Sequence, residues 1–107
     1  MEPRIIKVEE DELVYKNVVL VVVSKLLWFN STIRYMFPDA LKYAKVHMSK
    51  LLPKVLRYEY KGKVLYICVV KFDGIPPNRF PVDYQVEDAF KQVAAIAKEK
   101  GDYEIFY

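Results

Sequence analysis

The chain has very little of the residue types that build metal centres and disulfide frameworks. Its 107 residues include one cysteine, one histidine and three glycines. A single cysteine excludes a disulfide within the chain, and a structural zinc site needs four Cys or His ligands. The sequence also has no leader-like segment and no apolar run of about twenty residues. We therefore expect a cytoplasmic protein in reducing surroundings, with no membrane contact, no metal and no cofactor.

The two rare residues have ordinary structural interpretations. Cys68 lies within an apolar run, where we expect it to behave as a small hydrophobic residue. His47 lies on the flank of a predicted helical stripe, and no second His or Cys is close to it in the sequence. We expect a half-buried packing role for it, because one ligand does not make a metal site. One His and no Gly-x-Ser-x-Gly motif also leave no sign of a nucleophile–His–acid triad.

The composition that is present is that of a single globular domain. Apolar residues make up 53% and charged residues 29% of the chain, and the formal net charge is +3. These values predict one domain over residues 1–107 with one modest core. The mild positive charge permits an anionic ligand without requiring nucleic acid. The bias toward Ile, Val, Lys, Glu and Tyr is compatible with a thermophilic source.

Residues 18–23 (VVLVVV) are the most distinctive stretch. A β-branched run without polar alternation predicts a central strand buried on both faces. Ligands of open α/β sheets bind just beyond the carboxyl ends of such strands. The segment that follows the strand is therefore the first candidate binding site, and its candidate ligand-binding residues are Ser24, Lys25 and Asn30.

The remaining pattern predicts the element order β, β, α, β, β, α, β. The five predicted strands are residues 4–8, 18–23, 55–60, 63–70 and 103–107. An acidic turn at 9–12 follows the first strand, and a short extended piece at 13–15 leads into the second. A two-residue Lys61-Gly62 turn should join the third and fourth strands as a hairpin. An irregular, proline-rich loop is expected at 72–81.

Apolar residues at helical spacing predict the covering helices. They are a short helix capped by Asn30 or Ser31, a second over 38–52, and a third over 83–100 capped by Asp83 and ended by Gly101. The apolar stripe of the third helix is Val82, Val86, Phe90, Val93 and Ala97. The fold class is therefore α/β, with a mixed sheet of about five strands covered by two or three helices.

The order of these motifs resembles the macro domain. The resemblance rests on FPDALKY at 37–43, the hairpin, Lys71, the proline-containing loop and YQVEDAFKQVAAIAKEKG at 84–101. It is strongest for the branch of DNA ADP-ribose glycohydrolases and related deacylases, and it covers about the first two thirds of a full domain. It implies a three-layer sandwich cut short at the C-terminus and an ADP-ribose or nucleotide ligand. In an enzyme it implies ADP-ribosyl hydrolase-type activity, with Lys71 as the one matching functional residue.

The departures from this family weaken the expected activity. Residues 24–30 contain no glycine where the family has a pyrophosphate loop, and non-glycine residues rarely adopt positive φ. The second phosphate loop of the family would follow residues 103–107, where the sequence ends. We therefore expect weak or lost ligand binding, with Trp28 as a plug of the nucleotide space. The missing end also predicts an uncovered strand edge and hence a homodimer.

Lys71 and the loop after it form one set of candidate residues. If Lys71 is partly desolvated at its strand end, it can act as a nucleophile or acid–base group; otherwise it is an ordinary solvated lysine. Together with Lys25, the loop could bind an anionic ligand or merely form turns. Its candidate ligand-binding residues are Asp73, Asn78 and Arg79.

A basic series with interleaved tyrosines forms the alternative set. Lysines beside aromatic residues suit single-stranded nucleic acid, although they also simply keep a helix face soluble. This alternative is a non-catalytic accessory protein that binds nucleic acid or protein, as a virus or mobile element of an archaeon could carry. The missing glycines favour binding without catalysis. The basic residues concerned are Lys42, Lys45, Lys50, Lys54 and Arg57.

Overall fold

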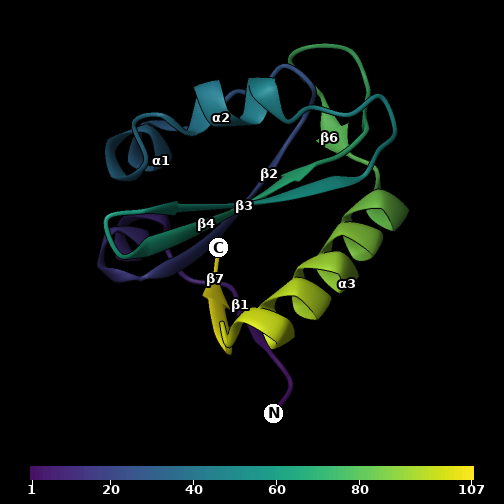
Figure 1. Ribbon diagram of the computed structural model, residues 1–107. Coiled ribbons are helices and arrows are strands. Elements are labelled where there is room, and N and C mark those ends of the chain that lie inside the picture. The colour runs from purple at the N-terminus through teal and green to yellow at the C-terminus, as the bar shows by residue number, and fades with distance from the viewer.

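A five-stranded mixed sheet forms the centre of the molecule. The computed structural model describes residues 1–107 and has the strand order β1-β7-β2-β4-β3 (Figure 1). Four neighbouring strands run parallel, and only the edge strand β3 is antiparallel to its neighbour. The predicted α/β class with a five-stranded mixed sheet is therefore confirmed. The strands are β1 (Arg4–Ile6), β7 (Glu104–Phe106), β2 (Val18–Val23), β4 (Lys63–Val69) and β3 (Lys54–Tyr60).

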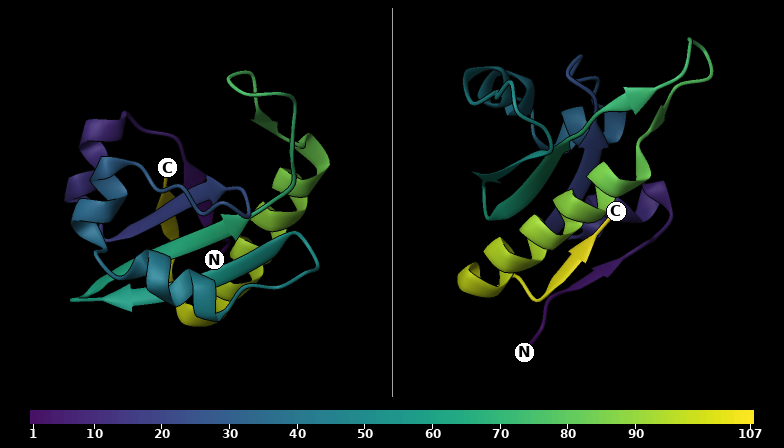
Figure 2. Two further views of the ribbon diagram at one scale, coloured as in Figure 1. Left: turned by 90° about the horizontal axis from the view of Figure 1, so that it is seen from above. Right: turned by 90° about the vertical axis from the view of Figure 1, so that its right-hand side faces the viewer.

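Helices cover both faces of this sheet (Figures 1 and 2). One face packs against the 3-10 helix η1 (Glu10–Tyr15), α1 (Ser31–Met36) and α2 (Ala40–Val46), and the other packs against α3 (Asp83–Lys100). The side chains of β2 alternate between the two cores: Val19 and Val23 belong to the first, and Leu20 to the second. The prediction that this strand is buried on both faces is confirmed. Full burial of each such side chain contributes about 1.5–3 kcal/mol.

The β3–β4 hairpin forms as its turn residues predict. Lys61 has φ 49° and Gly62 has φ 77°, so both central residues of the two-residue turn are left-handed. This turn geometry matches the twist of paired strands, which fixes the register from Tyr60 opposite Lys63 to Lys54 opposite Val69. The hairpin delivers β4 into the middle of the sheet, beside β2.

Two predicted boundaries in the first half of the chain are wrong. Residues 10–15 form η1 rather than the end of an acidic turn and an extended piece, because Leu13 turns inward and is only 5% exposed. Three acidic residues in its first turn suit a helical N-terminus. The second helix, α2, ends at Val46 and not at residue 52. Met48 and Leu52 still pack against the core, but from an irregular segment. In that segment the Leu51 amide donates to the Ser49 hydroxyl at 3.1 Å, which replaces a helical backbone bond.

The region around α3 also differs in detail. The proline-rich loop contains a short antiparallel ribbon, β5 (Phe72–Asp73) and β6 (Phe80–Pro81), where no regular structure was expected. Prolines are tolerated there because the ribbon has two free edges. Asp83 makes no capping bond, and Val82 is the N-cap of α3. The buried face of α3 is Gln85, Ala89, Val93 and Ala97, with Val86 and Phe90 half-buried beside it. Gly101 ends the helix as predicted, with φ 82°.

A half-buried polar network ties the end of α3 to the hairpin. Arg57 of β3 lies opposite Tyr66 of β4, and Asp102 follows α3. The Arg57 Nε atom donates to Asp102 Oδ2 at 3.0 Å and to the Tyr66 hydroxyl at 3.2 Å, and Tyr66 in turn donates to Asp102. Burial and then the bond to Asp102 raise the pKa of Tyr66. Burial alone would lower the pKa of Arg57, but its bonds to Asp102, Glu59 and Tyr66 together raise it.

We expect Asp102→Ala to lower the free energy of unfolding by about 3 kcal/mol, because it leaves the Arg57 charge half-buried without its partner. Glu59→Ala is the matched control, since Glu59 contacts the same guanidinium from a side chain that is 68% exposed. Its loss should cost about 0.5 kcal/mol. Urea unfolding of both variants checks this, and equal losses would contradict the role of Asp102.

Burial of Cys68 predicts a pH dependence. Burial raises the pKa of this thiol to about 12, from an ordinary value near 9.0. The folded protein therefore holds the proton more tightly than the unfolded chain does, so this contribution is complete below about pH 9 and is lost as the pH rises toward about 12. We expect negligible alkylation by iodoacetamide at pH 8 without denaturant and rapid alkylation in urea. Equal rates in the two conditions would rule this out.

Candidate functional site

The carboxyl ends of β2 and β4 meet at one edge of the sheet. Their six parallel pairs run to Val23 opposite Val69, and the next amide, that of Val70, donates to the Val23 carbonyl at 2.9 Å. The residues that leave these strands, Ser24 and Val70, therefore emerge side by side, and Lys25 and Lys71 directly follow them. The edge carries three depressions, and we name the largest the apolar pocket and the smallest the lysine pocket.

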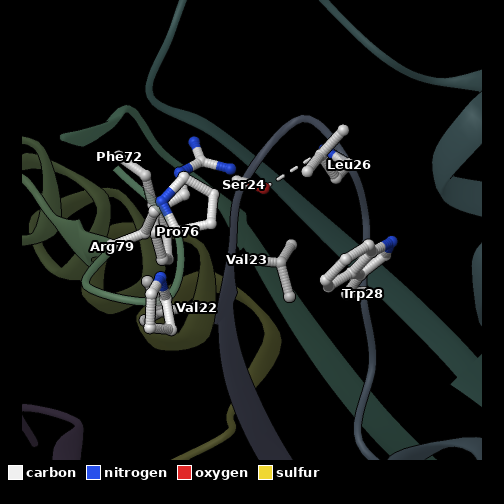
Figure 3. A pocket seen from close by; sticks show the side chains of 9 residues that line it. Val22, Val23, Ser24, Leu26, Trp28, Phe72, Pro76 and Arg79 are labelled. Atoms are coloured by element: carbon white, nitrogen blue, oxygen red, sulfur yellow. Dashed lines mark hydrogen bonds between the residues drawn. The ribbon is translucent and has the colours of Figure 1, made fainter. Parts of the chain in front are cut away.

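The apolar pocket lies over the end of β2 and has a volume of about 580 Å³. Figure 3 shows Phe72, Pro76 and Arg79 on one side of the strand end, with Leu26 and Trp28 on the other. Its polar groups are the Ser24 hydroxyl and the Arg79 guanidinium, whose central carbon lies 5.7 Å from the centroid of the Phe72 ring. A pocket of this size with a few polar groups is typical of small-molecule sites.

The turn after β2 explains why two large apolar side chains face solvent here. The Leu27 amide donates to the Ser24 carbonyl at 2.9 Å, and the Leu26 amide donates to the Ser24 hydroxyl at 3.2 Å. Leu27 itself has φ 55°, and its side chain is 4% exposed. Burying Leu27 directs its neighbours outward, so Leu26 is 55% and Trp28 81% exposed.

The geometry of this turn bears on two expectations. Positive φ is rare for residues other than glycine, and Leu27 is the one residue of the turn that adopts it, because burial of its side chain offsets a backbone strain of about 1–3 kcal/mol. Trp28 does not plug the space, since it stands exposed on the pocket wall.

A second depression of about 320 Å³ lies on the other side of Trp28, toward the ends of β1 and β7. Asn30 lines this depression and not the apolar pocket. The Asn30 side chain accepts the Ile33 amide at 2.9 Å, so it caps α1, as one of the two predicted caps. The Asn30 side-chain oxygen is therefore already used as the cap of α1.

The lysine pocket lies on the far side of the Ser24–Leu26 segment and has a volume of about 220 Å³. Lys25 and Lys71, two of the predicted candidates, both line this pocket and come from the ends of two strands. Lys50, from the segment before β3, also lines it. All three side chains are exposed. Lys71 thus lacks the desolvation that a nucleophile requires.

Gln85 links two of the segments that line this pocket. It is the one buried polar residue of the chain, with 6% exposure. Its side-chain oxygen accepts the Lys71 amide at 3.3 Å, and its nitrogen donates to the Leu52 carbonyl at 3.2 Å. Sequence reasoning missed this residue, although a glutamine at helical spacing from Ala89 and Val93 is a detectable signal.

Two of the candidate residues of the proline-rich loop lie outside both named pockets. Asp73 and Asn78 are exposed in the β5–β6 ribbon and line neither named pocket. The Asn78 amide donates to the Ile75 carbonyl at 2.8 Å, which is turn chemistry. Of that set, only Arg79 reaches the apolar pocket.

The predicted basic series does not form one surface. Lys42 and Lys45 are exposed on α2, and Lys54 is half-buried at the start of β3. Lys50 belongs to the lysine pocket, whereas Arg57 points to the opposite face of the sheet, into the network with Asp102.

The interleaved tyrosines pack on one another beneath α2. The rings of Tyr43 and Tyr58 are 4.8 Å apart, and those of Tyr58 and Tyr60 are 6.4 Å apart. The Tyr43 hydroxyl donates to the Arg57 carbonyl. His47 contacts Tyr43 at 4.4 Å between ring centroids but is exposed, not half-buried. Cys68 is buried, as predicted.

Comparisons of the chain with protein-family models, curated proteins and solved structures found no match. None of the helices combines the length and the apolar character needed to cross a bilayer. No group of three or more His, Cys, Asp or Glu residues is placed to hold a metal ion.

We expect Gln85→Leu to lower the free energy of unfolding by about 1–3 kcal/mol, because the Lys71 amide and the Leu52 carbonyl lose their hydrogen-bond partner. Gln92→Leu is the matched control, since Gln92 is an exposed glutamine on the same helix. Urea unfolding measures both variants. A Gln85→Leu variant as stable as the control would show that these two bonds do not hold the pocket.

Proposed function

We propose that this protein binds a nucleotide-type ligand at the carboxyl edge of its sheet and does so without catalysis. The observation that carries the proposal is the apolar pocket with an exposed Trp28 on its wall, directly beside a pocket lined by three lysines. A nucleotide combines a flat, largely apolar base with an anionic phosphate. The two pockets offer one environment for each part.

The chain path supports one ligand spanning both pockets. Lys25 lies between Ser24 and Leu26, and Lys71 directly precedes Phe72. Successive residues are about 3.8 Å apart along the chain, so lysines of one pocket alternate with lining residues of the other. An aromatic base stacked on a side chain such as Trp28 gains about 1–3 kcal/mol.

The resemblance of residues 37–43 and 84–101 to the macro domain favours ADP-ribose as the first ligand to test. A macro-type relationship is part of this proposal. In it, lysine side chains take the place of the glycine-rich backbone that would hold the pyrophosphate. The three-layer arrangement and the position of the pocket are compatible with such a relationship.

Catalysis through Lys71 is the weaker alternative. No carboxylate or histidine lines the lysine pocket, so Lys71 has no partner there to move a proton. Its exposure also favours charge recognition over nucleophilic attack.

Trp28 provides the test, because it is the only tryptophan of the chain. We expect its fluorescence to change on titration with ADP-ribose or AMP, and we expect Trp28→Ala to weaken binding about tenfold in calorimetry. Tyr15→Ala is the control, since Tyr15 is 83% exposed but lies before the start of β2, at the opposite edge.

Two results would overturn the proposal. One is the absence of any fluorescence or calorimetric response to adenosine, AMP and ADP-ribose. The other is an equal loss in the Trp28→Ala and Tyr15→Ala variants. A response to short single-stranded DNA alone, reduced when Lys42 and Lys45 are replaced by serine, would favour the nucleic-acid alternative instead.

A further inference from the structure

The lysine pocket brings three like charges together from separate parts of the chain. Lys25 follows β2, Lys71 follows β4, and Lys50 lies between α2 and β3. The other lining residues are Leu51, Leu52 and Gln85. None of the three lysines is in an ion pair, whereas the ion pairs of the chain use Arg4, Arg57 and Lys98. The convergence is repulsive by itself, so a bound anion would relieve it.

The backbone around Lys71 is fixed by hydrogen bonds. Gln85 joins the Lys71 segment to the Leu52 segment through its two amide ends. The Val70 amide binds the Val23 carbonyl, and the Val82 amide binds the Lys71 carbonyl at 2.9 Å. The backbone at Lys71 is therefore held in place, although the three lysines remain exposed.

We propose that the lysine pocket binds a phosphate group, as a phosphomonoester or a pyrophosphate, and that this group sets the direction of the ligand in the apolar pocket. The second half of this inference rests on the proposed nucleotide function; the first half does not.

The chemistry of the pocket favours phosphate over carboxylate. A phosphomonoester carries a charge of about −1.5 to −2 at neutral pH and three acceptor oxygens. Three separate ammonium groups are point-charge donors that suit such a group, whereas a carboxylate is best matched by the planar fork of an arginine. No arginine lines this pocket, and the one arginine nearby in the chain, Arg79, lines the apolar pocket.

The start of α3 adds to this preference. The Val82–Lys71 hydrogen bond places the N-terminus of this 18-residue helix beside the pocket. The partial positive charge of a helix N-terminus favours an anion. Asp83, the acidic residue of the first turn, is not among the lining residues.

The test compares a triple variant, Lys25→Ser, Lys50→Ser and Lys71→Ser, with a control that removes the same charge from exposed positions elsewhere. The control is Lys42→Ser, Lys45→Ser and Lys91→Ser. Calorimetry measures adenosine, AMP and inorganic pyrophosphate on each protein. In the wild type and the control we expect AMP to bind at least about tenfold tighter than adenosine. In the triple variant we expect that gain to vanish, with adenosine unaffected.

Salt gives an independent measurement. Raising sodium chloride from about 50 mM to about 500 mM should weaken AMP and pyrophosphate binding and leave adenosine binding unchanged, because only the phosphate contact is screened. If the triple variant does not fold by circular dichroism, Lys50→Glu replaces it, since Lys50 is exposed in an irregular segment.

The outcomes separate this inference from the proposed function. Pyrophosphate binding that the triple variant loses, without any adenosine binding, upholds the phosphate site and overturns the nucleotide function. Adenosine binding with no gain for AMP upholds the apolar pocket and overturns the phosphate site. If the control variant loses the tighter binding of AMP over adenosine to the same extent, the loss reflects a general charge effect. That result would also overturn the phosphate site.

Discussion

The parallel pairing of β2 with β4 is the interaction on which the rest of the structure depends. Six consecutive residue pairs join the two strands, from Val18 opposite Val64 to Val23 opposite Val69. Both strands carry apolar side chains on both faces, so neither is stable until helices cover the sheet above and below. Parallel pairing also requires a long crossover between the strands, and α1, α2 and β3 lie within it. Because the directions agree, both strands deliver their following residues to the same edge, where the pockets lie.

The two outer strands show how the sheet limits further pairing. On the β3 edge, the Tyr43 hydroxyl donates a hydrogen bond to the Arg57 carbonyl. On the other edge, β1 has only three residues, and Arg4 forms an exposed ion pair with Glu104. Short, charged or covered edges discourage strand addition by another chain. On β3, which has seven residues, this protection reaches one carbonyl, so the expected homodimer stays a prediction.

The parts of the fold that could be predicted are those specified by local patterns. A continuous valine-rich run is enough to place β2, and a Lys-Gly pair between two β-rich runs is enough to place the hairpin. The boundaries of η1 and α2 could not be found in this way. They depend on whether Leu13 turns into the core and on whether the Leu51 amide bonds to a helical carbonyl or to the Ser49 side chain, which the spacing of apolar residues does not decide.

The same distinction applies to the site. Lys25 and Lys71 could be paired in advance because both follow strands whose carboxyl ends meet. Lys50 could not be added to them, because the apolar spacing predicted a helix through residue 52, whereas α2 ends at Val46. Arg57 was placed with the wrong partners, although strand alternation separates it from Tyr58 and Tyr60 and directs it toward α3. The alternation of side chains along β3 thus predicts the position of Arg57 better than the clustering of basic residues in the sequence does.

The absence of glycine after β2 changes the kind of recognition that this edge can provide, and it does not close the edge. A glycine-rich loop binds phosphate through backbone amides that are already fixed, whereas each lysine loses up to about 2 kcal/mol of side-chain entropy when it is ordered. Exposed ammonium groups, in turn, need little desolvation to bind. In the proposed complex, a phosphate contact of this kind would therefore be modest and sensitive to salt. Binding in the apolar pocket would require no such ordering of lysine side chains, so most of the proposed affinity would come from Trp28 and the other residues that line this pocket.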